Sequence, residues 1–157
     1  MSEGHSPGSA LALLNKTVTD STDVETFITL FCGILDTRTN ELIYANAGHE
    51  PALYSVAERL STLDSTGPAV GLGIEIGYED KSIILQPGSV LLLYTDGVTE
   101  ARRGKSFLGT ERLGEHLAAC RSETSESVAR CIYQAALDFS EGEIRDDIAI
   151  LAVKANQ

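Results

Sequence analysis

Apolar and polar positions along the chain predict mainly β-strands, with helices concentrated near the C-terminus. Segments rich in Ile, Leu, Val, Phe or Tyr and bounded by turn-forming residues are typical of strands. Six such segments are predicted, at residues 27–35, 41–47, 51–56, 83–85, 90–95 and 148–153. The turn formers at 36–40 join the first two strands into a hairpin, and the glycine-rich residues 65–73 predict an irregular loop.

The clearest helical pattern follows Thr124, a residue that can cap a helix. Apolar residues recur there at three- and four-residue spacing: Val128, Cys131, Ile132, Ala135, Ala136 and Phe139. Shorter helices are predicted at 9–18 and 111–120. Strands in one run, followed by two helices and a final strand, do not alternate as parallel βαβ units do. The pattern therefore predicts an α+β fold built on an antiparallel β-sandwich.

The amino-acid composition and net charge limit the kinds of molecule that the chain is expected to bind. The chain has 157 residues, enough for one domain, and a formal charge of −11, which argues against binding nucleic acid or an anionic membrane. Proteins and small ions are the expected partners. No apolar run is long enough to span a bilayer and no signal peptide is evident, so we expect a cytoplasmic protein. Three cysteines without metal-ligand spacing are interpreted as small buried hydrophobic residues.

Two apolar strands place carboxylates at their ends. Asp96 follows the run at 90–95, and Asp146 and Asp147 precede the run at 148–153. If these strands are antiparallel neighbours, the end of the first lies beside the start of the second. Convergent carboxylates repel one another unless a cation lies between them, and oxygen ligands suit Mg²⁺ or Mn²⁺.

Structural alternatives remain open for each of these residues. Asp96 and Gly97 also form a common hairpin-turn dipeptide, which would leave the carboxylate in solvent. Asp146 and Asp147 can instead cap the start of a strand or lie in a solvent-exposed loop. His49, after the strand at 41–47, can either order its loop or face a metal site.

Four segments in order resemble the motifs of the SpoIIE-like serine phosphatases, which belong to the PPM superfamily of metal-dependent protein phosphatases. They are residues 26–36 (TFITLFCGILD), 44–51 (YANAGHEP), 92–101 (LLYTDGVTEA) and 146–151 (DDIAIL). The resemblance extends over about residues 8–154. It identifies that range as the C-terminal part of a phosphatase domain and leaves 1–7 as a disordered or cloning-derived N-terminus.

The resemblance implies a β-sandwich flanked by helices, with two Mn²⁺ or Mg²⁺ ions at one end. In the family a metal-bound water attacks the phosphorus of phosphoserine or phosphothreonine directly, without a phosphoenzyme. By position, Asp96 and Asp146 correspond to catalytic, metal-binding aspartates. Gly97 and Asp147 complete the implied metal site, with Asp147 the less suitable ligand and Gly97 allowing a tight backbone turn. Ala149 stands where the family usually has threonine.

The family's first motif, which supplies an aspartate that bridges both metals, has no counterpart here. Aligning Gly4 and His5 with that motif puts Met1 in the aspartate's place, and Glu3 is the nearest acid. The family binds two ions, whereas this chain is expected to hold one or none and to be N-terminally truncated relative to the family.

Two functions follow from these observations. The first is a protein serine/threonine phosphatase in stress-response signalling, acting on a phosphoprotein such as an anti-sigma-factor antagonist. The alternative is a degenerate or truncated phosphatase-fold module that acts by binding a protein. Missing strands would expose sheet edges, so the isolated chain is expected to form a homodimer or to be marginally stable.

Overall fold

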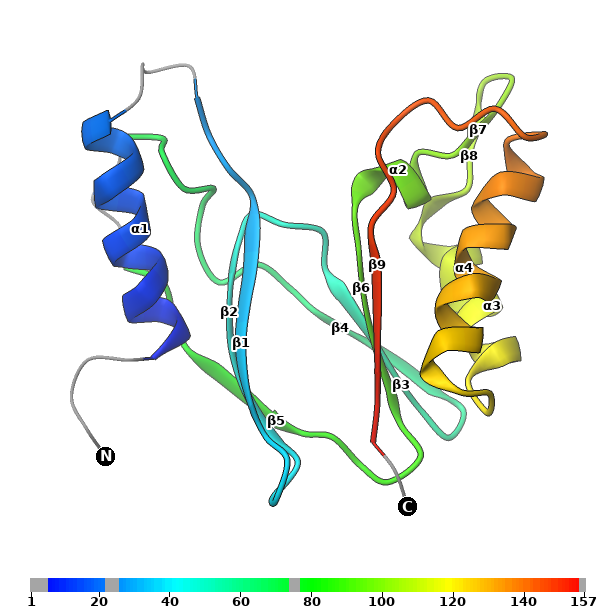
Figure 1. The fold of residues 1–157 in the computed structure, drawn as a ribbon, viewed down its shortest axis with the longest axis horizontal. Helices are drawn as coiled ribbons and strands as arrows, with labels where there is room; N and C mark the ends of the chain where they lie inside the picture. The colour runs from blue at the N-terminus through cyan, green and yellow to red at the C-terminus, as the bar shows by residue number, and fades with distance from the viewer. Residues whose placement is uncertain (1–5, 22–25, 74–76, 156–157) are drawn as a thin grey trace. The chain divides into compact units, whose positions relative to one another are not determined.

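The structure, a computed structural model, describes residues 6–21, 26–73 and 77–155. The chain forms two compact units, one comprising residues 1–51 and 64–85 and the other residues 52–63 and 86–157 (Figure 1). The sheets are antiparallel and are accompanied by helices, so the predicted α+β class is confirmed. None of the helices within the described ranges is both long and apolar enough to cross a membrane.

The first unit contains a three-stranded sheet in the order β1-β2-β5, together with one helix. Its elements are α1 (Pro7–Ser21), β1 (Leu30–Asp36), β2 (Glu41–Ala47) and β5 (Lys81–Ile84). Helix α1 lies against β1 and β2 (Figure 1). Leu11 and Val18 of the helix pack with Ala45 and Ala47 of β2, and this apolar contact forms the core of the unit.

The second unit contains a four-stranded sheet in the order β4-β3-β6-β9. Its strands are β3 (Ala52–Val56), β4 (Arg59–Leu63), β6 (Val90–Tyr94) and β9 (Ile150–Lys154). Strand β6 lies between β3 and β9, and its continuous apolar run is explained because Val90, Leu91 and Leu92 are all buried. Strand β9 is instead an edge strand, and Leu151 is 58% exposed.

Helices α3 (Gly109–Cys120) and α4 (Ser125–Phe139) cover one face of this second sheet (Figure 1). The predicted apolar stripe of α4 is confirmed by Val128, Ile132 and Ala136, each of which has no exposed surface. They pack with apolar residues of α3 and β6 in one core cluster. The short helix α2 (Asp96–Thr99) and the hairpin of β7 (Arg102–Arg103) and β8 (Ser106–Phe107) connect β6 to α3.

The predicted elements are present, with corrected bounds. Strand β1 begins at Leu30 because Phe27 is exposed and Ile28 makes only an isolated bridge, to Val70. The predicted helix at 9–18 extends over Pro7–Ser21. Strand β4 and the β7–β8 hairpin were not predicted, because most of their residues are polar and exposed. Residues 1–5, including Glu3, lie outside the described residues.

Thr124 caps helix α4 as predicted. Its hydroxyl oxygen accepts a hydrogen bond from the backbone N–H of Ser127 at 3.2 Å. Replacing Thr124→Ala should lower the free energy of unfolding by about 1 kcal/mol, because that N–H loses its partner. Urea unfolding followed by circular dichroism measures this change. Thr124→Ser keeps the hydroxyl and should retain most of the stability; equal losses in both variants would contradict the capping explanation.

Candidate functional site

The predicted meeting of Asp96 with Asp146 and Asp147 depends on the pairing of β6 with β9. These strands are antiparallel, with Tyr94 opposite Ile150. The C-terminal end of β6 and the N-terminal end of β9 therefore lie at the same edge of the sheet, as the sequence predicted.

Thr95 holds the two segments together at this edge. Its backbone N–H donates to the carbonyl of Ala149 at 3.1 Å. Its hydroxyl donates to the carbonyl of Asp147 at 2.8 Å and accepts from the N–H of Ala149 at 2.9 Å. These three bonds fix the start of α2 against the loop before β9. The role of Thr95 was not predicted, because its hydroxyl bonds to residues more than fifty positions away and does not cap helix α2.

Gly97 brings the two segments into close backbone contact. A Cβ added to Gly97 would lie 2.5 Å from the carbonyl oxygen of Asp147 and 3.3 Å from the carbonyl carbon of Asp146. Gly97 lies in helix α2 and is not among the glycines with positive φ. The expected reason for this glycine, a tight turn, is therefore wrong: close approach of the loop requires it. The hairpin-turn alternative for Asp96 and Gly97 is also excluded, because these residues begin a helix.

The acidic residues at this edge are exposed to solvent. Asp96, Asp146 and Asp147 are all exposed, and Asp146 Oδ1 accepts the N–H of Asp147 at 2.7 Å. Asp96 is the first residue of the four-residue helix α2. The sheet edge thus presents carboxylate oxygens, which are ligands suited to hard divalent ions.

The described residues do not complete a metal site. Within residues 6–21, 26–73 and 77–155, no three His, Cys, Asp or Glu side chains are grouped so that they could hold a metal ion. Asp96 and Asp146 therefore fit only part of the expected centre.

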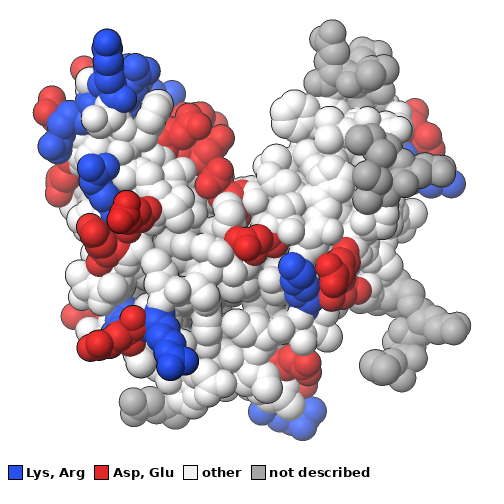
Figure 2. Space-filling view, turned by 180° about the vertical axis from the view of Figure 1, so that it is seen from behind, with Lys and Arg blue, Asp and Glu red and all other residues white. Residues whose placement is uncertain are grey.

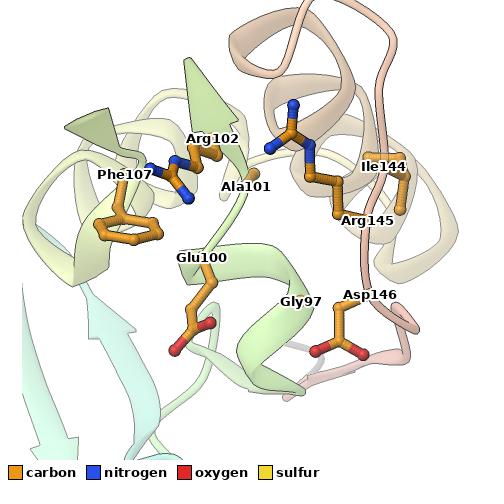
Figure 3. Close-up of a pocket in the computed structure, with 8 residues that line it drawn as sticks. All are labelled: Gly97, Glu100, Ala101, Arg102, Phe107, Ile144, Arg145 and Asp146. Atoms are coloured by element: carbon orange, nitrogen blue, oxygen red, sulfur yellow. The ribbon is translucent and has the colours of Figure 1, made fainter. Parts of the chain in front are cut away.

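A small pocket adjoins the acidic edge. It has a volume of about 160 Å³, and Gly97 and Asp146 form part of its lining together with Glu100 (Figure 3). Figure 3 shows the carboxylates of Glu100 and Asp146 on the two sides of α2. The pocket was not predictable from the sequence, because residues of α2, the β7–β8 hairpin and the loop before β9 form it together.

His49 belongs to the first compact unit, where hydrogen bonds hold its loop. Its N–H donates to Asn46 Oδ1 at 2.8 Å, and its carbonyl accepts from Asn46 Nδ2 at 3.1 Å. The ring Nδ1 lies 3.3 Å from the hydroxyl of Thr29. These contacts favour the loop-ordering interpretation of His49.

Of the three cysteines interpreted as buried hydrophobic residues, Cys120 is buried, whereas Cys32 and Cys131 are partly exposed. Cys120 is buried in the core of the second unit, and burial, with a smaller contribution from Cys131, raises the pKa of its thiol to about 12. Burial, with a smaller contribution from Asp80, also raises the pKa of Cys32. Cys120 therefore remains a neutral thiol at physiological pH, which makes it a poor nucleophile.

Comparisons with known proteins agree with this fold. The chain is similar to the PP2C domain of SiaA from Pseudomonas aeruginosa, with a TM-score of 0.84 and 21% identity over 96% of this chain and 61% of that chain. This structural similarity shows that the chain shares the fold of a PP2C domain. The family model for stage II sporulation protein E (SpoIIE) matches residues 1–156, so the chain belongs to the SpoIIE family.

Two curated relatives extend the comparison. The chain is 40% identical over 151 residues to protein IcfG of Synechocystis sp., covering 94% of this chain and 24% of IcfG. It is 28% identical over 153 residues to the phosphoserine phosphatase RsbU of Bacillus subtilis, covering 96% of this chain and 46% of RsbU. The chain thus spans less than half the length of either relative.

Proposed function

We propose that this chain is the C-terminal part of a metal-dependent protein phosphatase domain that hydrolyses phosphoserine or phosphothreonine on a regulatory protein. The observation that carries the proposal is the joint placement of Asp96 and Asp146 at one sheet edge, fixed by Thr95, in a chain of the SpoIIE family. Similarity to a protein named a phosphoserine phosphatase supports phosphoserine as the substrate group. An anti-sigma-factor antagonist is the class of phosphoprotein that we propose as substrate.

The proposed role of this chain is to present carboxylates for Mn²⁺ or Mg²⁺ binding. Bound metal ions in such an enzyme activate water and offset the charge of the phosphoryl oxygens. Asp96 and Asp146 would contribute ligands, Gly97 would keep the loop close, and Asp147 is a weaker candidate ligand. Because the described residues lack a third grouped ligand, we propose that a carboxylate outside them completes the centre.

Phosphate release by the complete gene product tests this function. A phosphoserine peptide and p-nitrophenyl phosphate should both be hydrolysed with Mn²⁺, a chelator should stop the reaction, and added Mn²⁺ should restore it. The rate of hydrolysis by the Asp96→Asn variant of the same protein serves as the background rate. Hydrolysis no faster than in that variant, at saturating Mn²⁺, would show that the protein is not an active phosphatase.

The incomplete ligand set favours a second candidate, a phosphatase-fold module that binds a phosphoprotein without turnover. Calorimetric titration with Mn²⁺ separates the two functions. Binding of two ions per protein together with hydrolysis supports the enzyme. Peptide binding without metal binding or hydrolysis supports the module.

A further inference from the structure

The pocket beside the acidic edge has an apolar wall and two arginines. Ala101, Phe107 and Ile144 line it together with Arg102 and Arg145 (Figure 3). Its volume of about 160 Å³ is close to that of one amino-acid side chain rather than of a cofactor. The pocket thus combines a small apolar surface with positive charge.

The side chain of Arg102 is held in place by two contacts, but no carboxylate among the described residues pairs with its charge. Its Nε donates to the carbonyl of Gly104 at 2.7 Å, and its guanidinium carbon lies 5.5 Å from the centre of the Phe107 ring. Among the described residues, no carboxylate lies within ion-pair distance of Arg102. Its guanidinium therefore keeps N–H donors available for an anion.

Arg145 forms an ion pair with Glu143, and both side chains are exposed to solvent. Its Nη2 lies 3.0 Å from Glu143 Oε2, and the two side chains are 63% and 73% exposed. Such a surface pair is weak and can be exchanged for another anion at little cost in free energy. Both arginines can therefore bind a negatively charged group that enters the pocket.

Positive and negative groups are separated within the site. In Figure 3 the guanidinium groups of Arg102 and Arg145 lie at one end, and the carboxylates of Glu100 and Asp146 at the other. On the surface around the pocket, Figure 2 shows both basic and acidic side chains at the end of the second unit that carries the β7–β8 hairpin. The chain has a net charge of −11, and the pocket lining carries two acidic residues as well as its two arginines, so an anion is favoured only at the arginine end.

We propose that this pocket binds the residue next to the phosphoserine of the substrate and that Arg102 and Arg145 select an acidic side chain there. The inference rests on the proposed function, in which the phosphoryl group lies at the Asp96 and Asp146 edge. Neighbouring residues of an extended peptide are about 3.3–3.6 Å apart along the chain, so a flanking residue reaches a pocket that Asp146 also lines. The apolar wall would contact the methylene groups of a glutamate, and the arginines its carboxylate.

Fluorescence anisotropy with labelled phosphoserine peptides tests this selection in the complete gene product. Peptides carrying Glu at one or two positions on either side of the phosphoserine are compared with otherwise identical Gln peptides. The wild-type protein should bind at least one Glu peptide about threefold to tenfold more tightly. Arg102→Gln and Arg145→Gln should each reduce that preference and change the affinity for the Gln peptide less than about twofold.

Lys105→Gln is the matched control. It removes the same charge from the turn between β7 and β8, but Lys105 is exposed and does not line the pocket. It should retain the wild-type preference for the Glu peptide. Urea unfolding of each variant verifies that the fold is intact.

Two results would overturn the inference. One is equal binding of the Glu and Gln peptides by the wild-type protein. The other is an equal loss of affinity for both peptides and for inorganic phosphate in Arg102→Gln, which would place this arginine at the phosphoryl group. Hydrolysis measured on the same samples tests the proposed function separately. Selective peptide binding without hydrolysis contradicts only the proposed phosphatase function. Hydrolysis without a preference for the Glu peptide contradicts only the proposed role of the two arginines.

Discussion

Asp146→Asn is expected to lower phosphopeptide hydrolysis by the complete gene product about 100-fold or more. The substitution removes a negative charge from the proposed metal site, and lost metal binding removes several kcal/mol of transition-state stabilisation. The local structure should survive, because the side-chain oxygen of asparagine can still accept the N–H of residue 147, as Asp146 Oδ1 does at 2.7 Å. Rates at saturating Mn²⁺, together with calorimetric Mn²⁺ affinity, measure the effect.

Asp147→Asn provides the neighbouring comparison. Asp147 contributes to the site through its backbone. Its carbonyl accepts a hydrogen bond from the Thr95 hydroxyl, and its N–H donates to Asp146 Oδ1. Asparagine preserves both backbone bonds, so this variant should lose less than about tenfold in rate. If Asp147→Asn were more damaging than Asp146→Asn, the assignment of Asp146 as the principal ligand would be wrong.

Gly97→Ala is expected to destabilise the second unit and to reduce activity together. The new Cβ would lie 2.5 Å from the carbonyl oxygen of Asp147, so helix α2 and the loop before β9 must separate. Overpacking of this kind costs about 1–3 kcal/mol, and the higher helix propensity of alanine recovers only about 0.5–1 kcal/mol of it. Urea unfolding and hydrolysis rates of the same preparation measure both consequences.

Gly77→Ala is a suitable control, because an added Cβ there meets no atom of the described residues within 4 Å. It should change neither stability nor hydrolysis by a measurable amount. Wild-type stability and rate in Gly97→Ala would show that the close contact between the two segments is dispensable.

The placement of the segments that carry Asp96 and Asp146 at one sheet edge was predictable, because it follows from strand patterning. A buried central strand needs apolar residues on both faces, and the run at 90–94 has them. Antiparallel pairing with the final strand then places the two flanking acidic segments at one edge. The motif order independently identified the family, and the match of the SpoIIE family model confirms that identification.

Other features were not predictable, because they depend on contacts between distant segments. Strand β4 has four exposed residues out of five and follows β3 after a very short turn, so its sequence carries little strand pattern. Helix α2 replaces the hairpin turn that an Asp-Gly dipeptide commonly forms, because Thr95 fixes its start to the loop before β9. The roles of Thr95 and Arg102 likewise depend on partners that sequence spacing does not reveal.

The amino-acid sequence by itself determined the α+β class, the family and the pair of acidic segments at a sheet edge, because hydrophobic periodicity and ordered motifs are local properties of the chain. The tertiary structure alone decided why Gly97 must be a glycine, how Thr95 joins two segments, and which side chains line the pocket. Each of these depends on the distance between residues about fifty positions apart, such as Gly97 and Asp147. Such distances are set by strand pairing and packing, and no local pattern specifies them.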